Sequence, residues 1–320
     1  MQLRGLLSAA AGLVLVAGAV AACANSADQP DSLERLTDAA VSPAPPAADT
    51  AAWSPQATQH RVVDAGGHRR EFILHVPAGA EQRSKLPVIF VFHGYLEEAA
   101  TIREYSGLDA ADALVAYMQG VDNAWAPAPY AATSGEQDLA FVDAAFNQLT
   151  HDFSVDRARV FAAGLSNGGG FAAYLGCQRP QEFTAVATVA GAFYEKVSEG
   201  CSMIPMKHID FHGTADPVIA YAGGSRHNHV YDSTAELMSD AAERNRCDPQ
   251  PVERIVSNDM VEQRWVGCDA GLVHYRIVGG AHVWPGGGKD PSTTVPSGFA
   301  TRTMLEFFGV PSTSAATSGF

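Results

Sequence analysis

The sequence predicts one α/β domain built on a mostly parallel central sheet that is flanked by helices. Three observations support this prediction. The chain has 320 residues, and 47 % of them are hydrophobic, which is enough for one large core. Strand and helix patterns alternate over residues 61–309, and this alternation is typical of a parallel sheet. Several strands are continuous apolar runs, as expected for strands buried on both faces.

The predicted elements follow one another along the chain. A hairpin of residues 61–67 and 68–77 comes first. Further strands are predicted at residues 86–94, 114–120, 158–164, 183–191, 207–213 and 272–280. Helices are predicted at residues 135–153, 168–177, 233–247 and 297–310. Leu139, Val142 and Phe146 recur at helical spacing in the first helix and indicate its buried face.

The first 22 residues have the composition of an export signal. Arg4 lies in a short start, and an uncharged apolar stretch that ends in small residues follows it. The run "VAAC" that ends at Cys23 is typical of bacterial lipoproteins, in which this cysteine is lipidated and becomes the N-terminus. Ordinary cleavage after Ala24 and a retained membrane anchor are the alternatives. We expect an exported chain that is either held at the outer face of the membrane by its lipid or secreted.

The segments on either side of the folded domain have a different composition. Residues 23–60 are rich in Ala, Pro, Ser and Asp and have no sustained apolar period, which predicts a disordered tether. Residues 310–320 are predicted to be a short polar tail. The folded domain is therefore predicted at residues 61–309.

The cysteine count predicts disulfide bonds. The chain has five cysteines, and lipidation of Cys23 leaves an even number in an oxidising setting. The remaining four allow three pairings. Proximity along the chain favours Cys177 with Cys201 and Cys247 with Cys268, because these pairs close short loops. Free, buried thiols are the alternative.

Charge and motif content argue against several kinds of partner. The net charge of -14 disfavours nucleic-acid binding, which needs clustered Lys and Arg. Gly288 and Lys289 resemble the end of a phosphate-binding loop, but Val283 stands where that loop needs a glycine. His208 and His212 are spaced like a metal pair on a helix, but they fall in a predicted strand. We therefore expect no cofactor and no metal.

Functional side chains are sought at the carboxyl ends of the strands, where parallel sheets form their sites. Residues 164–168 follow one strand, precede a helix and match the pattern G-x-S-x-G. In this pattern a sharp strand-to-helix turn exposes a serine above the sheet. Gly164 and Gly168 are needed because a Cβ there would clash with the neighbouring backbone. We predict that Ser166 is a nucleophile.

Two further strand ends provide an acid and a base. Asp216 lies just past a strand in a Thr-Ala-Asp-Pro turn, whereas Asp210 falls inside that strand. His282 lies on a glycine-rich loop beyond the next predicted strand. The other histidines after Asp216 lie inside a strand or in a polar segment, namely His227, His229 and His274. The order of serine, acid and histidine along the chain is one that serine hydrolases use, so we predict a triad of Ser166, Asp216 and His282.

Other residues are candidates to complete the site. A His-Gly turn follows an early strand, and the backbone N–H of the next residue, Tyr95, is predicted to bind an oxyanion. The second donor is predicted to be the N–H of Asn167, which follows the nucleophile. Trp284 and Trp125 are candidates for the wall of an acyl or aromatic pocket, and ordinary packing is the alternative.

These motifs resemble one family. The runs "VFHG", "GLSNGG", "HGTADPVI" and "GGAHVWPGG" are similar to those of exported esterases of the polyhydroxybutyrate depolymerase and feruloyl esterase type, in carbohydrate esterase family 1. The resemblance extends over residues 60–309 and implies an α/β-hydrolase fold with a Ser-His-Asp triad. It also implies a disulfide like Cys247–Cys268. Many relatives carry "HGC" or "HGxGG" where this chain has "HGYLEEA", so Tyr95, Glu97 and Glu98 are expected to line the entrance differently.

The resemblance implies an exported serine esterase that hydrolyses carboxylic esters of the polyhydroxyalkanoate or of the feruloyl or acetyl polysaccharide type. An envelope acyltransferase with the same triad is one alternative. A non-catalytic envelope lipoprotein and a serine peptidase are others. We expect an ester substrate, a membrane contact only through the N-terminal lipid, no nucleic acid and a monomer.

Overall fold

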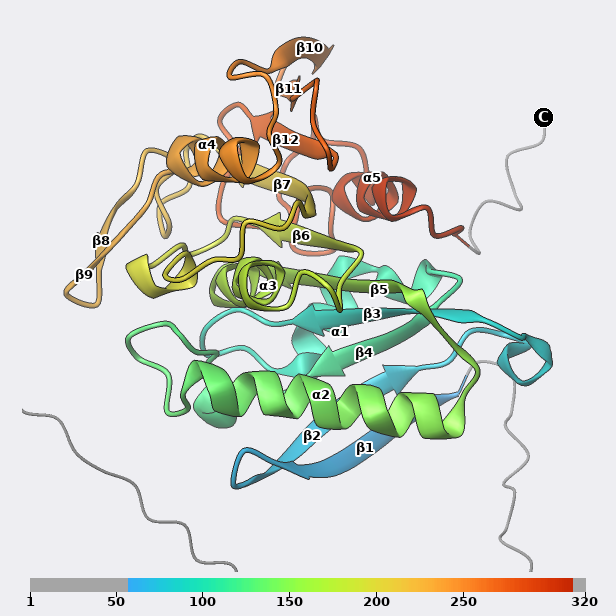
Figure 1. Cartoon of the computed structure of the whole chain (residues 1–320). Coiled ribbons are helices and arrows are strands. Elements are labelled where there is room, and N and C mark those ends of the chain that lie inside the picture. Colours follow the sequence, from blue (N-terminus) through green and yellow to red (C-terminus); the bar gives the residue numbers. More distant parts are fainter. Residues whose placement is uncertain (1–56, 313–320) are drawn as a thin grey trace, which may run out of the picture. The chain divides into compact units, whose positions relative to one another are not determined.

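The central feature of the computed structural model, which describes residues 57–312, is a 10-stranded sheet with helices on both faces (Figure 1). The strand order is β1-β2-β4-β3-β5-β6-β7-β12-β11-β10. The strands from β4 to β12 in this order are parallel to their neighbours. Antiparallel strands extend the sheet at both edges. The predicted fold class, an α/β-hydrolase with a mostly parallel central sheet, is confirmed.

The elements have the following bounds. The strands of the large sheet are β1 (Thr58–Ala65), β2 (His68–His75), β3 (Leu86–Phe92), β4 (Leu114–Met118), β5 (Val155–Leu165), β6 (Ala185–Val189), β7 (Lys207–Gly213), β10 (Val252–Ser257), β11 (Met260–Arg264) and β12 (Leu272–Ile277). A separate hairpin is formed by β8 (Gly224–Arg226) and β9 (His229–Tyr231). The α-helices are α1 (Ala99–Ser106), α2 (Gly135–Asp152), α3 (Asn167–Gln178), α4 (Thr234–Arg244) and α5 (Phe299–Phe308).

The apolar runs form strands that are buried on both faces, and β3 shows this best. Every residue of β3 is buried. Ile89 and Val91 pack in a cluster with residues of α1 and α5. Val88 and Phe90 pack in a second cluster with residues of α2 and α3, and these two helices lie in front of the sheet in Figure 1. The period of two along β3 thus places one core on each side of the sheet.

A buried ion pair ties α2 to the first hairpin. Arg70 of β2 and Asp138 of α2 are both buried, and their Nη1 and Oδ1 atoms are 2.8 Å apart. The other oxygen of Asp138 accepts the N–H of Ala126 at 2.9 Å. Helix α2 begins here because Ser134 and Gln137 form a capping box. The loop before α2, which reaches the site, is therefore fixed to two elements of the core.

The predicted boundaries of the domain differ slightly from the observed ones. Strand β1 begins at Thr58, so residues 58–60, predicted as the end of the tether, pair with β2. At the other end Val310 is buried, and the Pro311 carbonyl accepts the N–H of Asp112 at 2.8 Å, so the predicted tail begins too early. The predicted export signal, the rest of the tether, Cys23 and residues 313–320 lie outside the described residues.

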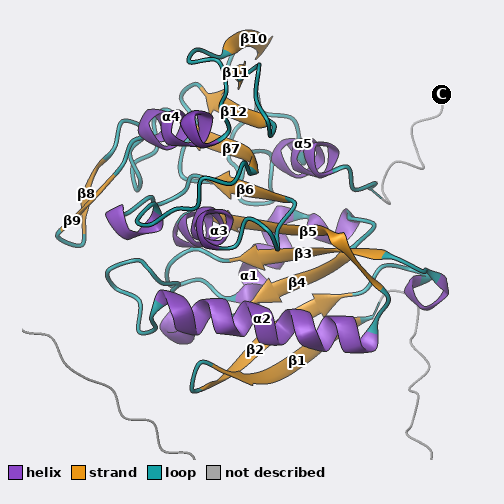
Figure 2. Cartoon of the chain, in the orientation of Figure 1, coloured by secondary structure: helices purple, strands orange, loops and turns teal. Residues whose placement is uncertain are grey.

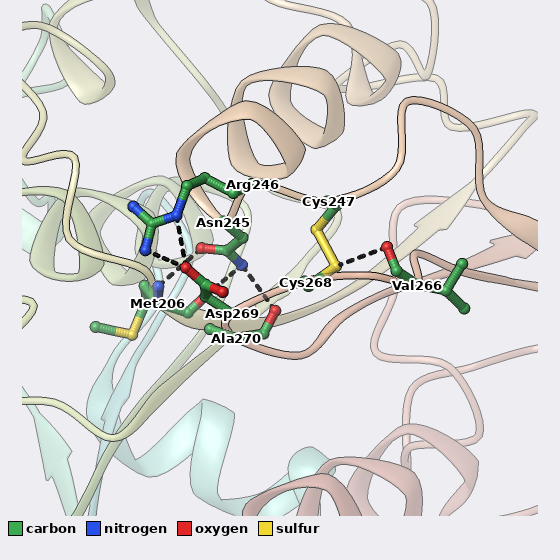
Figure 3. The surroundings of a disulfide bond; sticks show 8 residues. All are labelled: Met206, Asn245, Arg246, Cys247, Val266, Cys268, Asp269 and Ala270. Atoms are coloured by element: carbon green, nitrogen blue, oxygen red, sulfur yellow. Dashed lines mark hydrogen bonds and ion pairs between the residues drawn. A yellow bond between two sulfur atoms is a disulfide. The ribbon is translucent and has the colours of Figure 1, made fainter.

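Both disulfides that proximity favours are present: Cys177–Cys201 and Cys247–Cys268. The second lies beside Asn245, which follows α4 and is fully buried (Figure 3). The Asn245 side chain exchanges two hydrogen bonds of 2.8 Å with the backbone of Met206, just before β7, and donates to the Ala270 carbonyl at 3.2 Å, just before β12. Asn245 and the Cys247–Cys268 disulfide together form a clamp, which joins the starts of two neighbouring strands.

Helix α1, the outer strands β10 and β11, and the β8–β9 hairpin were not predicted. Helix α1 is short, β10 is largely exposed, and β11 is only partly buried. The β8–β9 hairpin projects beyond the large sheet (Figure 2). None of the helices within residues 57–312 has the length and apolar character that a membrane span requires.

Candidate active site

Ser166 occupies a sharp turn between β5 and α3. Its backbone angles are φ 55° and ψ −117°, a conformation that residues other than glycine rarely adopt. The two flanking glycines make the turn possible. A Cβ at Gly164 would lie 2.2 Å from the Gly168 carbonyl oxygen, and a Cβ at Gly168 would lie 2.1 Å from the Phe92 carbonyl oxygen. The geometry is that of a nucleophile elbow at the carboxyl end of a parallel strand.

Asp216 and His282 meet at the same edge of the sheet. Asp216 follows β7, and His282 follows the neighbouring strand β12. The Nδ1–H of His282 donates to Oδ2 of Asp216 at 2.7 Å. Because Nδ1 carries the proton, Nε2 is the nitrogen available as a base. This is the contact that a Ser-His-Asp triad requires between its acid and its base.

Asp216 is held as a carboxylate by three hydrogen-bond donors and by the nearby ring of His212. Its Oδ1 accepts the backbone N–H groups of Val218 at 2.8 Å and Ile219 at 2.9 Å. Its Oδ2 faces His282 and, at 3.4 Å, Nε2 of His212. Burial alone would raise the pKa of Asp216, but the hydrogen bonds from His212 and His282 lower it well below its ordinary value. The Asp216 carboxyl group is therefore ionised in the folded protein at neutral pH.

His212 is a second histidine on the acid, and the sequence did not reveal it. Its Nε2–H donates to the Ile219 carbonyl at 2.9 Å, and its Nδ1 is 3.1 Å from the hydroxyl of Thr234. Burial lowers the pKa of His212, but the Asp216 hydrogen bond and the charge of Asp210 outweigh it and raise the pKa. The neighbouring His208 binds the Thr188 hydroxyl instead. Within residues 57–312 no three acidic, His or Cys side chains gather as a metal site.

The backbone segments that carry the predicted oxyanion donors lie next to Ser166. Asn167 is the first residue of α3, so its N–H has no partner within the helix. Tyr95 follows Gly94, and an ideal Cβ on Gly94 would be 3.6 Å from the Cβ of Ser166. The structure brings both backbone segments to the nucleophile.

His93 orients the peptide that carries the Tyr95 N–H. Its Nε2 accepts the N–H of Gly120 at 3.0 Å, so its Nδ1 carries the proton and donates to the Gly94 carbonyl at 2.7 Å. That carbonyl and the Tyr95 N–H belong to one planar peptide group. Burial lowers the pKa of His93 to about 4, so the ring is neutral at neutral pH.

The two tryptophans that were candidates for the wall of a substrate pocket are core residues instead. Trp125 is fully buried, and its ring stacks on Phe171 at 5.3 Å while its Nε1–H donates to the His93 carbonyl. Trp284 is 1 % exposed, and its Nε1–H donates to Thr301 of α5 at 2.9 Å. Neither ring reaches a surface that a substrate could contact. Large aromatic rings pack well in a core when their N–H finds a partner, and both do so here.

The ring of Tyr95, in the oxyanion segment, belongs to a group of aromatic rings that also includes Tyr130, His227 and Tyr194. The ring of Tyr95 is 4.1 Å from that of Tyr130 and 5.5 Å from that of His227. His227 lies at the tip of the β8–β9 hairpin and is exposed. Tyr194 is 5.8 Å from Tyr130 and also lines a groove of about 650 Å³. No pattern in the sequence links these residues, because a hairpin and a loop far apart in the chain bring them together.

Comparisons with known proteins identify esterases. No family model matches the chain. The chain is similar to NocK from Nocardia uniformis subsp. tsuyamanensis, a protein assigned as an esterase. The two are 30 % identical over 257 residues, which cover 72 % of this chain and 75 % of NocK. Feruloyl esterase C from Emericella nidulans is 29 % identical over 250 residues, which cover 75 % of this chain and 83 % of that protein.

A solved structure supports the fold. The acetyl xylan esterase from Aspergillus awamori aligns with a TM-score of 0.54 over 78 % of this chain and 99 % of that chain, at 15 % identity. At this level of identity the likeness concerns the architecture alone.

Proposed function

The chain belongs to the esterase family of NocK and feruloyl esterase C and is a carboxylic ester hydrolase, and we propose that Ser166, Asp216 and His282 are its catalytic triad. One observation carries the proposal. The Asp216–His282 hydrogen bond of 2.7 Å lies at the sheet edge where the strained Ser166 elbow also lies. Acid, base and nucleophile thus come from three strand ends at one edge, as the α/β-hydrolase mechanism requires.

The proposed reaction proceeds through an acyl-enzyme. His282 Nε2 takes the proton of the Ser166 hydroxyl as the oxygen attacks the ester carbonyl. Asp216 fixes the ring tautomer and stabilises the imidazolium that forms. The N–H groups of Asn167 and Tyr95 bind the oxyanion, and one such donor contributes about 3 kcal/mol to transition-state stabilisation. His282 then protonates the leaving alcohol. Water gives a proton to His282 and attacks the acyl-enzyme, and the proton passes to Ser166 as the acid is released.

We propose that the substrate is an ester of an aromatic acid or an acetyl ester carried by a polysaccharide. The names of the relatives support this class. The partly buried rings of Tyr95 and Tyr130 and the exposed ring of His227 support the aromatic acyl group, because flat rings stack on such faces. The groove of about 650 Å³ beside Tyr194 is large enough for several sugar units.

A substitution of the nucleophile tests the triad. Ser166→Ala is expected to abolish hydrolysis of methyl ferulate and p-nitrophenyl acetate and to prevent labelling by a fluorophosphonate probe. Ser239→Ala, an exposed serine on α4, is the matched control and is expected to be unaffected. Hydrolysis by Ser166→Ala at the wild-type rate would contradict the proposal.

Two parallel assays address the alternatives. Product analysis with an added acceptor alcohol distinguishes hydrolysis from acyl transfer. The rate of hydrolysis of a polyhydroxybutyrate film is compared with the rate on a polysaccharide ester.

We further propose that the enzyme is exported as a monomer and is held at the membrane through a lipid on Cys23. The signal-like composition of residues 1–22 supports this. So do the two disulfides, because such bonds persist in oxidising compartments.

A further inference from the structure

Glu97 lies on the loop that carries Tyr95, and its carboxylate turns back to the start of this loop. Its Oε2 accepts the backbone N–H of Gly94 at 3.1 Å, and its own N–H donates to the Gly94 carbonyl at 3.1 Å. An ideal Cβ on Gly94 would be 3.1 Å from Oε2 of Glu97 and 3.6 Å from the Cβ of Ser166. Gly94 is therefore close to both this carboxylate and the proposed nucleophile.

Two further groups bind the Glu97 carboxylate. The Tyr105 hydroxyl, on α1, donates to Oε2 at 2.9 Å. Burial and the charge of Glu97 raise the pKa of Tyr105 far above its ordinary value, so its hydroxyl stays a donor. The ammonium of Lys289 is 3.7 Å from Oε1 and 5.0 Å from the centre of the Tyr105 ring. These donors offset a negative charge that would otherwise oppose an oxyanion nearby.

Lys289 connects this cluster to the loop that carries His282. The neighbouring Gly288 donates its N–H to the Tyr105 carbonyl at 2.9 Å, so the loop is also attached to α1 through its backbone. Glu97, Tyr105 and Lys289 thus join the oxyanion loop, α1 and the histidine loop within one set of contacts.

We propose that Glu97 is a positioning residue for ester hydrolysis, which holds the Gly94–Tyr95 peptide so that the Tyr95 N–H points to the oxyanion. The inference rests on the proposed function. His93 and the Glu97 N–H both bind the Gly94 carbonyl, while the Glu97 carboxylate binds the Gly94 N–H. Both peptide groups of Gly94 are therefore fixed. A donor oriented in advance lowers the barrier without strengthening substrate binding, so Glu97 should act on kcat and not on KM.

Substitutions of Glu97 test the proposal. Glu97→Ala removes the acceptor for the Gly94 N–H and is expected to lower kcat about 10- to 100-fold with KM changed less than about 3-fold. Its affinity for a boronic-acid or phosphonate mimic of the tetrahedral intermediate is expected to fall by a similar factor. Glu97→Gln keeps an acceptor and is expected to recover most of the kcat. Glu104→Ala is the matched control, because Glu104 is an exposed glutamate on α1 and has no role in the proposed site.

The outcomes separate this proposal from the triad. If Ser166→Ala is inactive but Glu97→Ala has the kcat of Glu104→Ala, only the positioning role is wrong. A loss confined to KM also overturns it. If Ser166→Ala stays active, the triad itself is wrong. Glu97→Asp is used if the alanine variant does not fold. It keeps the negative charge but moves the acceptor away from the Gly94 N–H by one methylene group, so kcat is expected to fall. An unchanged kcat would overturn the proposal.

Discussion

At the scale of single residues, the site depends on backbone atoms that approach one another closely. Gly164 and Gly168 allow strand β5, helix α3 and the end of β3 to meet around Ser166. Any side chain at Gly168 would overlap the Phe92 carbonyl. The strain at Ser166 is therefore maintained by the packing of its neighbours, which is how strained residues persist in folded proteins.

Gly168→Ala should thus damage both stability and activity. The added methyl group forces α3 away from β3, so we expect a destabilisation of about 1–3 kcal/mol and a loss of kcat of at least about 100-fold. Gly271→Ala is the control, because a Cβ there meets its nearest atom at 3.6 Å. Urea unfolding and ester hydrolysis measure the two effects, and equal behaviour of the two variants would refute the argument.

The motifs made the proposed triad predictable, whereas its supporting residues were not. Ser166, Asp216 and His282 each follow a recognisable strand, and the order of strand ends needs no three-dimensional knowledge. His212 and Glu97 act through contacts across the fold, so no local pattern distinguishes them. Trp284 was predicted to line the pocket because it stands two positions from His282, but its ring is buried in the core.

At the scale of elements, the outer strands of the sheet depend on polar pairs instead of deep burial. Glu262 of β11 lies opposite Tyr275 of β12, and the Tyr275 hydroxyl donates to Glu262 at 2.6 Å. Arg254 of β10 and Arg264 also bind this carboxylate. Glu262 is 4 % exposed and thus lies at the centre of the antiparallel extension.

This cluster makes stability depend on pH. Burial alone would raise the pKa of Glu262, but hydrogen bonds from Tyr275, Arg254 and Arg264 outweigh burial and lower the pKa to about 2. The unfolded glutamate has a pKa of about 4.3. The folded protein therefore binds fewer protons, so the stabilisation is present above about pH 4.3 and is lost as the pH falls towards about 2.

Glu262→Gln should remove this dependence. We expect a loss on the order of 2 kcal/mol at pH 7 and a flatter decline of stability between about pH 4.3 and pH 2. Glu253→Gln on the exposed β10 is the control. Urea titrations at several pH values measure both, and parallel declines for Glu262→Gln and the wild type would contradict the assignment.

The exposed elements that the sequence analysis missed share a physical cause. Strands buried on both faces produce long apolar runs, and those were found. Strand β10 is exposed along most of its length, and the β8–β9 hairpin is only three residues on each side. Their sequences lack the apolar period on which such predictions depend.

At the scale of the whole molecule, residues far apart in the sequence converge on one edge of the sheet. Strands β3, β5, β7 and β12 are spatial neighbours or next neighbours, and their carboxyl ends deliver Tyr95, Ser166, Asp216 and His282. Every part of this site lies within residues 57–312. Anchoring and catalysis should therefore be separable.

Cys23→Ser tests that separation. The variant is expected to move from the membrane fraction to the medium, because a lipid anchor no longer holds it. Its kcat/KM for a soluble p-nitrophenyl ester is expected to stay within about 2-fold of the wild-type value, since the site is remote in sequence. Fractionation by centrifugation and an esterase assay measure both. Retention of Cys23→Ser in the membrane fraction would exclude the lipid as the anchor.

The clamp formed by Asn245 and the Cys247–Cys268 disulfide has a consequence for when the enzyme becomes active. It joins the starts of β7 and β12, the two strands whose far ends hold Asp216 and His282. The cytosol keeps thiols reduced, so in the export route that we propose the disulfide would form only after the chain has left the cytosol. The pairing of the proposed acid and base would then depend on the redox state of the surroundings, and we expect full hydrolytic activity only in the oxidised chain.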